Sequence, residues 1–368
     1  MRNALLLPSR RQCLRLALGA GATLAAGAAL PGDARSLGGP ASGITATTGL
    51  VWRERRLQGL GTDLSLRAAH ADAFRADVAL DAAVAAIRHV ERQFSLFDPD
   101  SALSRLNREG VLQQPHPDFL RLMTLARQVA RRSGGRFDAT VQPLWLAWQH
   151  AKTQGRLPTD IELGRARARL GWAAISLGAD AIRFQKPGMA VTLNGIAQGF
   201  AGDLASAALR AHGVEHALLD TGEWNLWGHS PDAGSWRLGV ANPRSPGPAG
   251  GSGQALSPLI ATLDLGANNG RPNSPRAVAT SSDAHYRFGD GDRHHHIFDP
   301  QTGRSPATLA SVTVLAPTCT MADALTRVLF MGSLDDASKM AQHWQVDVLA
   351  VDKSGRWVAS PGLRKLIT

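Results

Sequence analysis

The feature that most constrains how this chain folds is the alternation, after about residue 50, of short β-like segments with stretches of helical spacing. Residues 57–69 alternate loosely around a Gly-Leu-Gly-Thr turn and predict a strand with a turn inside it. From residue 81 to 94, apolar residues recur at helical spacing, and a second helix is predicted over 117–132, ended by two glycines. Helices and paired strands therefore share one core.

The second half of the chain continues this alternation. Helices are predicted over 200–212, from Thr320 to about Met331, and after the capping box Ser333-x-x-Asp336. Strands are predicted at AISLG (174–178), AIRFQ (181–185), AVTLN (190–194), ALLDTGEWNLWG (217–228), WRLGVA (236–241), LIATLDL (259–265), AVATSS (277–282), SVTVLA (311–316) and VDVLAVD (346–352). No internal repeat appears. We predict a mixed α/β chain of the α+β class, one large domain over residues 52–368 with mainly antiparallel sheets packed against helices.

The composition of the N-terminal residues differs from that of the predicted domain. Residues 1–34 contain Ser9-Arg10-Arg11 and a weakly apolar run ending in small residues, which predicts a twin-arginine signal peptide. Residues 35–51 are expected to form a flexible tether. This leader predicts export to the periplasm, with an inner-membrane anchor as the alternative if the signal is not cleaved. The twin-arginine route carries folded proteins, often with a cofactor in place, so the leader makes a cofactor site worth looking for.

The net charge limits the classes of binding partner, and the cysteine content bears on disulfide bonds. The formal charge is +10, and the leader carries +3 of it, so the exported chain remains basic. The arginines are dispersed and there is one tyrosine, which argues against nucleic acid and favours a nucleotide phosphate or peripheral membrane association. Cys13 lies in the leader and Cys319 is the other cysteine, so no disulfide framework is predicted.

Three stretches contain candidate site residues. In RHHHIFDPQTGRSP, neighbouring strand residues point to opposite faces, so His295 cannot join His294 and His296; a zinc site completed by His285 and a half-exposed strand both remain open. VTLNGIAQGFAGD (191–203) predicts a strand, a turn and a helix whose N-terminus can meet a phosphate, or glycines that only allow close packing. In TMADALTRVLFMG, Asp323 is placed in the first turn of a helix, as a dipole-stabilising carboxylate or, with Thr326, as a Mg²⁺ ligand.

Taken in order along the chain, six motifs resemble the ApbE family, the FAD:protein FMN transferases, from about Arg56 to Leu349. These motifs are FSLFDPDSALSRLN, GRFDATVQPLW, LNGIAQGFAGDLASAALRAHGVEHALLDTGEWNLWG, AVATSSD, HHIFDPQTGRSP and SVTVLAPTCTMADALTRVLFMG. The resemblance implies an ApbE-like single domain that binds FAD as a substrate. It also implies Mg²⁺-dependent cleavage of FAD and transfer of FMN to a Thr or Ser of an exported acceptor protein. The alternative is a catalytically degenerate relative that binds FAD or docks on a flavoprotein.

The resemblance also assigns roles to individual residues. Metal positions fall at the Gly195 carbonyl and at Asp323, with Thr326 nearby, and catalytic positions at Asp323, Gln198 and Arg327. His296, Asp299, Thr302 and Gly303 are expected to shape a turn over the nucleotide. The positions implied for FAD binding are Leu60, Phe97, Asp138, Thr140, Thr192, Gln198, His296, Ile297, Asp299, Thr302 and Gly303.

The chain departs from the family pattern at its expected site. Thr192 replaces an aspartate, Gln198 replaces a lysine, and Arg327 replaces a metal-ligating threonine. A glycine pair expected after the middle motif reads Gly222-Glu223. We hypothesise that Arg327 substitutes in part for Mg²⁺ or for the missing lysine, because a charged donor binds a phosphate more strongly than a neutral amide does.

Overall fold

The structure is a computed structural model that describes residues 49–245, 258–266, 276–284, 286–289 and 291–368. The predicted signal peptide, nearly all of the predicted tether and His285 lie outside these residues. Within the described ranges, no helix is long and apolar enough to span a membrane.

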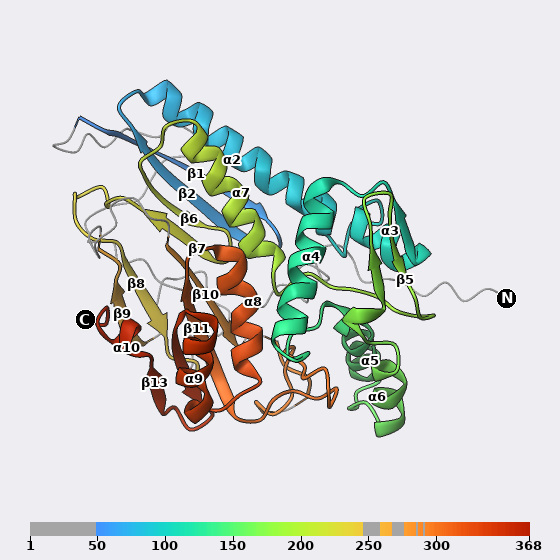
Figure 1. The fold of residues 1–368 in the computed structure, drawn as a ribbon. Coiled ribbons are helices and arrows are strands. Elements are labelled where there is room, and N and C mark those ends of the chain that lie inside the picture. Colours follow the sequence, from blue (N-terminus) through green and yellow to red (C-terminus); the bar gives the residue numbers. More distant parts are fainter. Residues whose placement is uncertain (1–48, 246–257, 267–275, 285, 290) are drawn as a thin grey trace.

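A large antiparallel sheet forms the centre of the fold (Figure 1). Its strands, in spatial order, are β1 (Val51–Gly59), β2 (Thr62–His70), β6 (His216–Asp220), β7 (Trp224–Trp227), β10 (Arg276–Ser282), β11 (Leu309–Ala316), β12 (Asp347–Asp352) and β13 (Trp357–Ala359). A second sheet has three strands, in the order β3 (Val111–Gln113), β5 (Ala181–Phe184) and β4 (Ile175–Leu177). A third sheet pairs β8 (Arg237–Ala241) with β9 (Leu259–Asp264). Every pair of neighbouring strands runs antiparallel, as the sequence predicts.

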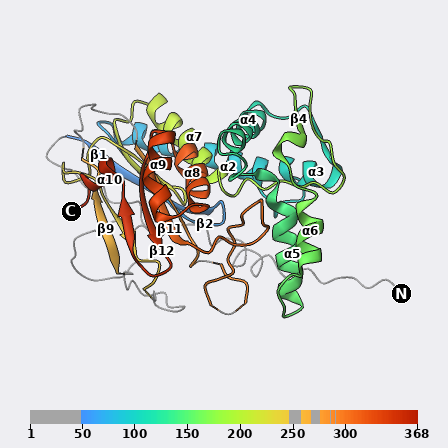
Figure 2. The ribbon, with the colours of Figure 1, turned by 60° about the horizontal axis from the view of Figure 1, so that its bottom comes forward.

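The helices form two groups. Those that pack along the large sheet are α2 (Ala73–Phe94), α7 (Ala197–Ala211), α8 (Cys319–Phe330) and α9 (Leu334–Trp344) (Figure 1). Those that lie beside the sheet are α3 (Ala102–Glu109), α4 (Pro117–Arg132), α5 (Gln142–Thr153) and α6 (Asp160–Arg167) (Figure 2). The short elements are η1 (Ala139–Val141), η2 (Trp172–Ala174) and α10 (Pro361–Arg364). The fold is the predicted α+β arrangement.

Three apolar clusters hold these layers together. The largest fills the space between the helices and the large sheet and includes Phe119 and Phe200. A second, around Trp236 and Leu238, joins the sheet to β8 and β9. A third surrounds Trp148 next to α5 and α6. The main core therefore lies directly beneath α7 and α8.

Several predicted elements agree closely with the structure. The helix at 117–132 is α4, and the capping box at Ser333 and Asp336 is formed. The helix predicted from residue 81 begins earlier, at Ala73, because the Asp72 side chain accepts hydrogen bonds from two free backbone N–H groups of the first turn. Helices α3, α5 and α6 are short and were not predicted.

The strand predicted at 190–194 is wrong. Val191 does not join a ladder, because the Asn107 side chain takes the place of a partner strand: its Oδ1 accepts from the Val191 N–H at 2.7 Å, and its Nδ2 donates to the Val191 carbonyl at 2.8 Å. A single amide side chain of α3 thus satisfies both backbone groups of Val191 at the approach to α7.

Candidate active site

The N-terminal turn of α7 lies in direct contact with the N-terminal turn of α8. A Cβ atom at Gly199 would lie 2.3 Å from the Cys319 carbonyl oxygen and 2.8 Å from the Thr320 nitrogen. Only glycine allows the two backbones to approach this closely. The glycines that predicted either a phosphate-binding turn or close packing therefore have a packing role at this position.

The two helices cap one another. The Gly199 N–H of α7 donates to Asp323 Oδ2 of α8 at 3.1 Å. In return Asp203 of α7 accepts from the Cys319 N–H at 2.8 Å and from the Thr320 N–H at 2.9 Å. Each carboxylate satisfies N–H groups that a helix start leaves without an internal partner.

The sequence-based placement of Asp323 in the first turn of its helix is wrong. Helix α8 begins at Cys319 with Thr318 as its N-cap, so Asp323 lies in the second turn. From there its carboxylate faces the N-terminus of α7 rather than the start of its own helix.

Two buried acids meet at this junction. Asp323 is 1% exposed, and burial raises its pKa to about 6, although the Arg327 charge and the Gly199 N–H oppose the shift. Glu223, at the start of β7, is 3% exposed; burial and the Asp323 charge raise its pKa well above the ordinary value. The Thr280 N–H donates to Glu223 Oε2 at 3.2 Å. The junction therefore contains a carboxyl group that titrates near neutral pH.

Arg327 and Gln198 complete the group. A Cβ at Gly195 would lie 3.2 Å from Arg327 Cγ and 3.2 Å from its Nε, so the arginine side chain lies against the turn before α7. The Gln198 amide lies against Gly222, whose φ of +92° is a conformation that favours glycine. Four residues singled out in the sequence, Gly195, Gln198, Asp323 and Arg327, are thus brought together by the fold.

Thr326 faces a different neighbour. Its hydroxyl donates to the Asp323 carbonyl oxygen at 2.6 Å and lies 2.6 Å from Ser281 Oγ on β10. The side chain is buried between α8 and the sheet. The Thr326 hydroxyl therefore has one hydrogen-bond partner on its own helix and one on the sheet.

The FDAT segment forms a buried network next to the approach to α7. Asp138 accepts from the Thr140 N–H at 2.8 Å, from the Thr140 hydroxyl at 2.6 Å and from the Trp172 N–H at 3.3 Å. Burial raises the pKa of Asp138 in spite of these bonds. The Thr192 N–H donates to the Ala139 carbonyl at 2.8 Å. One hydrogen-bonded network therefore connects Asp138, Thr140 and Thr192.

The three adjacent histidines do not form one cluster. His295 is fully buried against the Phe330 ring, with centroids 5.6 Å apart, whereas His294 lies 5.2 Å from the Trp148 ring. Burial lowers the pKa of His295 to about 4, so its imidazole is neutral at physiological pH. The predicted half-exposed strand is wrong, because a single bridge between Arg287 and His295 replaces it. His296 is half-buried, and its backbone N–H donates to the Tyr286 backbone carbonyl at 3.1 Å.

The predicted turn after the histidines is present. Asp299 accepts the Gly303 N–H through its carbonyl at 2.8 Å, and Gly303 has a φ of +72°. Trp148 Nε1 donates to the Gly303 carbonyl at 3.0 Å, and the Thr302 hydroxyl accepts from the Arg304 N–H at 3.2 Å. Ile297, just before the turn, belongs to the main core.

Leu60 and Phe97 both lie near the C-terminal end of α2. Leu60 has a φ of +47°, unusual for a branched residue, and its N–H donates to Glu91 Oε1 at 3.1 Å. Phe97 is 48% exposed and offers an accessible aromatic face.

Sequence reasoning missed three charged groups, two at the junction and one after β10. Glu223 was noted only as a replaced glycine, and the capping role of Asp203 gave no local signal. Asp283, fully buried after β10, is paired with both Arg244 and Lys353. Lys353 in turn lowers the pKa of His295. These residues are far apart in sequence, so only the fold reveals their proximity.

Comparisons with known proteins identify the family to which the chain is similar. The ApbE family model matches residues 60–350. The FAD:protein FMN transferase of Vibrio cholerae is 29% identical over 276 residues, 73% of this chain and 77% of that protein. The protein of the same name from Treponema pallidum is 28% identical over 308 residues, 77% of this chain and 80% of that protein.

Solved structures give the same answer for the fold. The ApbE protein of Thermotoga maritima superposes with a TM-score of 0.73 at 24% identity, covering 86% of this chain and 99% of that one. The flavin transferase ApbE of Vibrio cholerae superposes with a TM-score of 0.69 at 25% identity, again over 86% and 99%. The resemblance and the fold class predicted from the sequence are confirmed.

Proposed function

This chain belongs to the ApbE family, and we propose that it is an FAD:protein FMN transferase that acts at the junction of α7 and α8. The observation that carries the proposal is the cluster formed there. A carboxyl group with a pKa of about 6, the N-terminal turn of α7 and the Arg327 side chain lie together, and all three types of group assist transfer of a phosphoryl group.

The proposed reaction breaks one bond and forms one. A Thr or Ser hydroxyl oxygen of the acceptor protein attacks the phosphorus of the FMN half of FAD. The bond from that phosphorus to the bridging oxygen breaks, and AMP leaves with the bridging oxygen. The hydroxyl proton passes to the Asp323 carboxylate, directly or through a water molecule. Because burial raises the pKa of Asp323 to about 6, this carboxylate is ionised at neutral pH and still basic enough to accept a proton.

Charge at the pyrophosphate comes from two sources in this proposal. The N-terminal turn of α7 contributes the positive end of its helix dipole, while its Gly199 N–H holds the Asp323 carboxylate in place. Arg327, held against Gly195, adds a full positive charge where the relatives' pattern has a neutral threonine. Gln198 contributes a neutral donor in place of a lysine.

The described side chains do not form an unmodified magnesium site. Mg²⁺ prefers oxygen ligands in octahedral geometry, and Asp323 and the Gly195 carbonyl are donors of that type. The Arg327 side chain, however, lies against Gly195, and the Thr326 hydroxyl is engaged by Ser281 and the helix backbone. We therefore propose that Arg327 supplies part of the charge that the metal would bring.

The acceptor is proposed to be an exported protein. This part rests on the predicted twin-arginine leader and on the basic charge of the chain, which suits an anionic dinucleotide or a membrane surface. The same leader supports a periplasmic location, with an inner-membrane anchor if it is retained.

A second function, FAD binding without transfer, is favoured by the altered positions Thr192, Gln198 and Arg327. The test is to incubate the purified chain with FAD and the exported protein encoded nearest to it, with and without Mg²⁺, and to follow fluorescent flavin on the denatured acceptor. The transferase predicts a covalent band that Asp323→Asn greatly weakens. FAD binding with no covalent band would support the second function.

The role of Arg327 has its own comparison. Arg327→Thr restores the residue type of the family pattern, and Arg327→Lys retains the charge but not the planar guanidinium. We expect Arg327→Thr to make transfer more dependent on added Mg²⁺, and Arg327→Lys to retain more metal-free activity. Unchanged turnover and metal dependence in Arg327→Thr would refute the role.

A further inference from the structure

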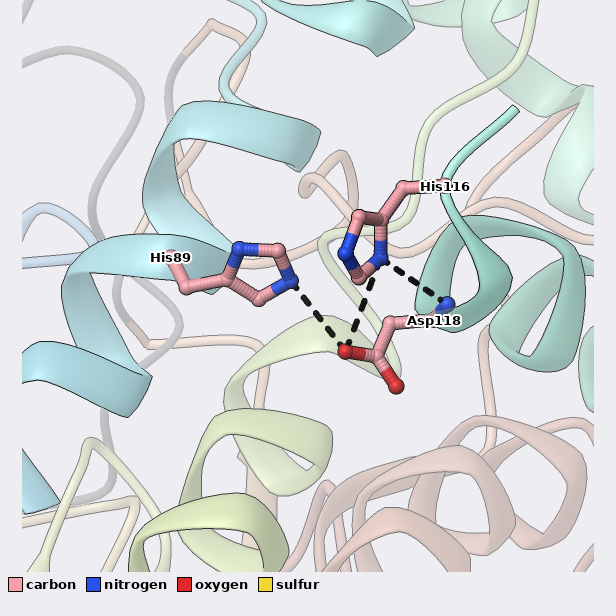
Figure 3. Close-up of side chains that lie close together, drawn as sticks. All are labelled: His89, His116 and Asp118. Atoms are coloured by element: carbon pink, nitrogen blue, oxygen red, sulfur yellow. Dashed lines mark hydrogen bonds and ion pairs between the residues drawn. The ribbon is translucent and has the colours of Figure 1, made fainter. Parts of the chain in front are cut away.

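A second group of ligand-type side chains lies away from the α7–α8 junction, where α2 meets α4 (Figure 3). His89 projects from α2, while His116 is the N-cap of α4 and Asp118 lies in its first turn. Among the residues that the structure describes, this is the one group of three or more His, Cys, Asp or Glu side chains whose ligand atoms all lie within 4.8 Å of one another.

The distances match those of a small metal site. His89 Nε2 lies 3.2 Å from Asp118 Oδ2, and His116 Nδ1 lies 3.7 Å from the same oxygen. Zinc binds nitrogen and oxygen at about 2.0–2.1 Å in tetrahedral geometry, which places neighbouring ligand atoms roughly 3.3 Å apart. The two distances to the Asp118 carboxylate lie near this spacing and the two imidazole nitrogens lie within 4.8 Å of each other, so a metal requires the side chains to close around it.

The hydrogen bonds indicate which nitrogen of the neutral His116 ring carries the lone pair. The Asp118 N–H donates to His116 Nδ1 at 3.1 Å, so in the neutral ring this nitrogen holds a lone pair and the proton is on Nε2. That lone pair now accepts the N-cap hydrogen bond, and Nδ1 lies 3.7 Å from Asp118 Oδ2, so a metal bound at Nδ1 would replace this hydrogen bond (Figure 3). His89 Nε2 approaches the carboxylate from α2, and a metal would replace the proton that now links them.

We propose that His89, His116 and Asp118 bind a divalent first-row transition metal, with zinc as the representative ion, and that the metal joins α2 to α4. Two imidazoles and one carboxylate favour zinc or copper, whereas magnesium and calcium take oxygen ligands. The side chains of His89 and Asp118 are 25% and 26% exposed and that of His116 is 44% exposed, so solvent supplies the remaining ligand.

The site bridges two helices that already pack together. Phe94 of α2 stacks on Phe119 of α4 with ring centroids 5.0 Å apart, close to the proposed ligands on each helix. The metal therefore adds a bond between existing neighbours, and it stabilises the folded chain because the unfolded chain does not hold the three ligands together. This inference does not depend on the transferase proposal.

The test measures zinc binding to the full chain, purified without a polyhistidine tag, by isothermal titration calorimetry and by thermal unfolding. We expect one zinc ion per chain, a higher unfolding temperature with zinc, and no competition from a large excess of magnesium. His89→Gln and Asp118→Asn should each weaken binding by about tenfold or more, since even loss of a supporting residue around a metal weakens affinity about 10–100-fold.

Two variants separate the loss of a ligand from unfolding and from zinc binding at the triple-histidine stretch. His116→Asn removes the imidazole but places a favourable N-cap residue at the start of α4, so the apoprotein should remain folded while zinc binding is lost. His294→Gln alters the triple-histidine stretch and should leave zinc affinity unchanged. The proposal is overturned if the wild type binds no zinc at millimolar concentration, if His116→Asn binds as the wild type does, or if His294→Gln alone abolishes binding.

Discussion

Replacing Gly199 by alanine should separate α7 from α8 and destabilise the protein. The added Cβ would lie 2.3 Å from the Cys319 carbonyl oxygen, whereas ordinary contacts begin near 3.4 Å, so the helices must move apart by about 1 Å. The obstructing atoms belong to a backbone and cannot rotate away. The Gly199 N–H bond to Asp323 and the Asp203 bonds to the start of α8 would lengthen together.

The magnitude follows from these contacts. Overpacking costs about 1–3 kcal/mol, and each weakened hydrogen bond to a carboxylate costs about 1.5–3 kcal/mol. The better helix propensity of alanine returns about 1 kcal/mol. If the three lengthened bonds together lose the value of one, the net loss in the free energy of unfolding is about 1.5–5 kcal/mol. In a chain of this size that corresponds to a fall of roughly 2–8 °C in the unfolding temperature.

Thermal unfolding followed by tryptophan fluorescence measures this effect, and Gly164→Ala provides a matched control. Gly164 is exposed within α6, and a Cβ there meets nothing within 4 Å, so alanine should raise the free energy of unfolding by about 0.5–1 kcal/mol. If Gly199→Ala unfolds at the wild-type temperature, the close approach of the two helices does not constrain this position.

Three further predictions concern the same region. Asp323→Asn should reduce FMN transfer by about 10²–10⁴-fold with FAD binding retained, and wild-type transfer should rise with pH through about 6 as this carboxyl ionises; a flat pH–rate profile would remove Asp323 as the proton acceptor. Thr326→Val should lower the free energy of unfolding by about 1–3 kcal/mol in urea titrations, because Ser281 loses its partner, and an unchanged midpoint would show that the pair contributes nothing. The folded-state pKa of His295, about 4, lies below its ordinary 6.5, so the stability contributed by its neutral imidazole is present above pH 6.5 and is lost as the pH falls toward 4. In His295→Asn the free energy of unfolding should fall less steeply over that interval. Equal slopes of the free energy of unfolding against pH in the two proteins would contradict the burial of a neutral imidazole.

The fold was predictable from local patterns to the extent that those patterns are long. Helix α4 was located to the residue because Pro117 opens it, apolar residues recur on one face and glycines follow it. Helix α6 was missed because its eight residues give a weak period. Helix α5 is as long as α8, but its apolar residues pack on aromatic rings from distant segments, so the sequence alone did not indicate a helix there. The 190–194 segment has the composition of a strand, and only the fold shows that Asn107 replaces the neighbouring strand.

The candidate site was predictable only in its motif residues. Gly195, Gln198, Asp323 and Arg327 were identified through the family resemblance and do converge. Residues whose importance comes from burial carry no such signal. The pKa of Glu223 is raised because the fold excludes water around its carboxyl group and places the Asp323 charge nearby. The proposed metal ligands were not noticed in the sequence, because His89 and His116 lie in separate helices and meet through their packing.

The Asn107 side chain has a consequence for local motion. In a ladder, the Val191 amide would exchange its hydrogen only when neighbouring strands part, yet here a single side chain of the eight-residue helix α3 protects it. Opening of α3 alone exposes that amide while the large sheet stays closed. Hydrogen exchange at the Val191 amide therefore reports the opening of α3, at a point where the Val191 side chain is itself part of the main core.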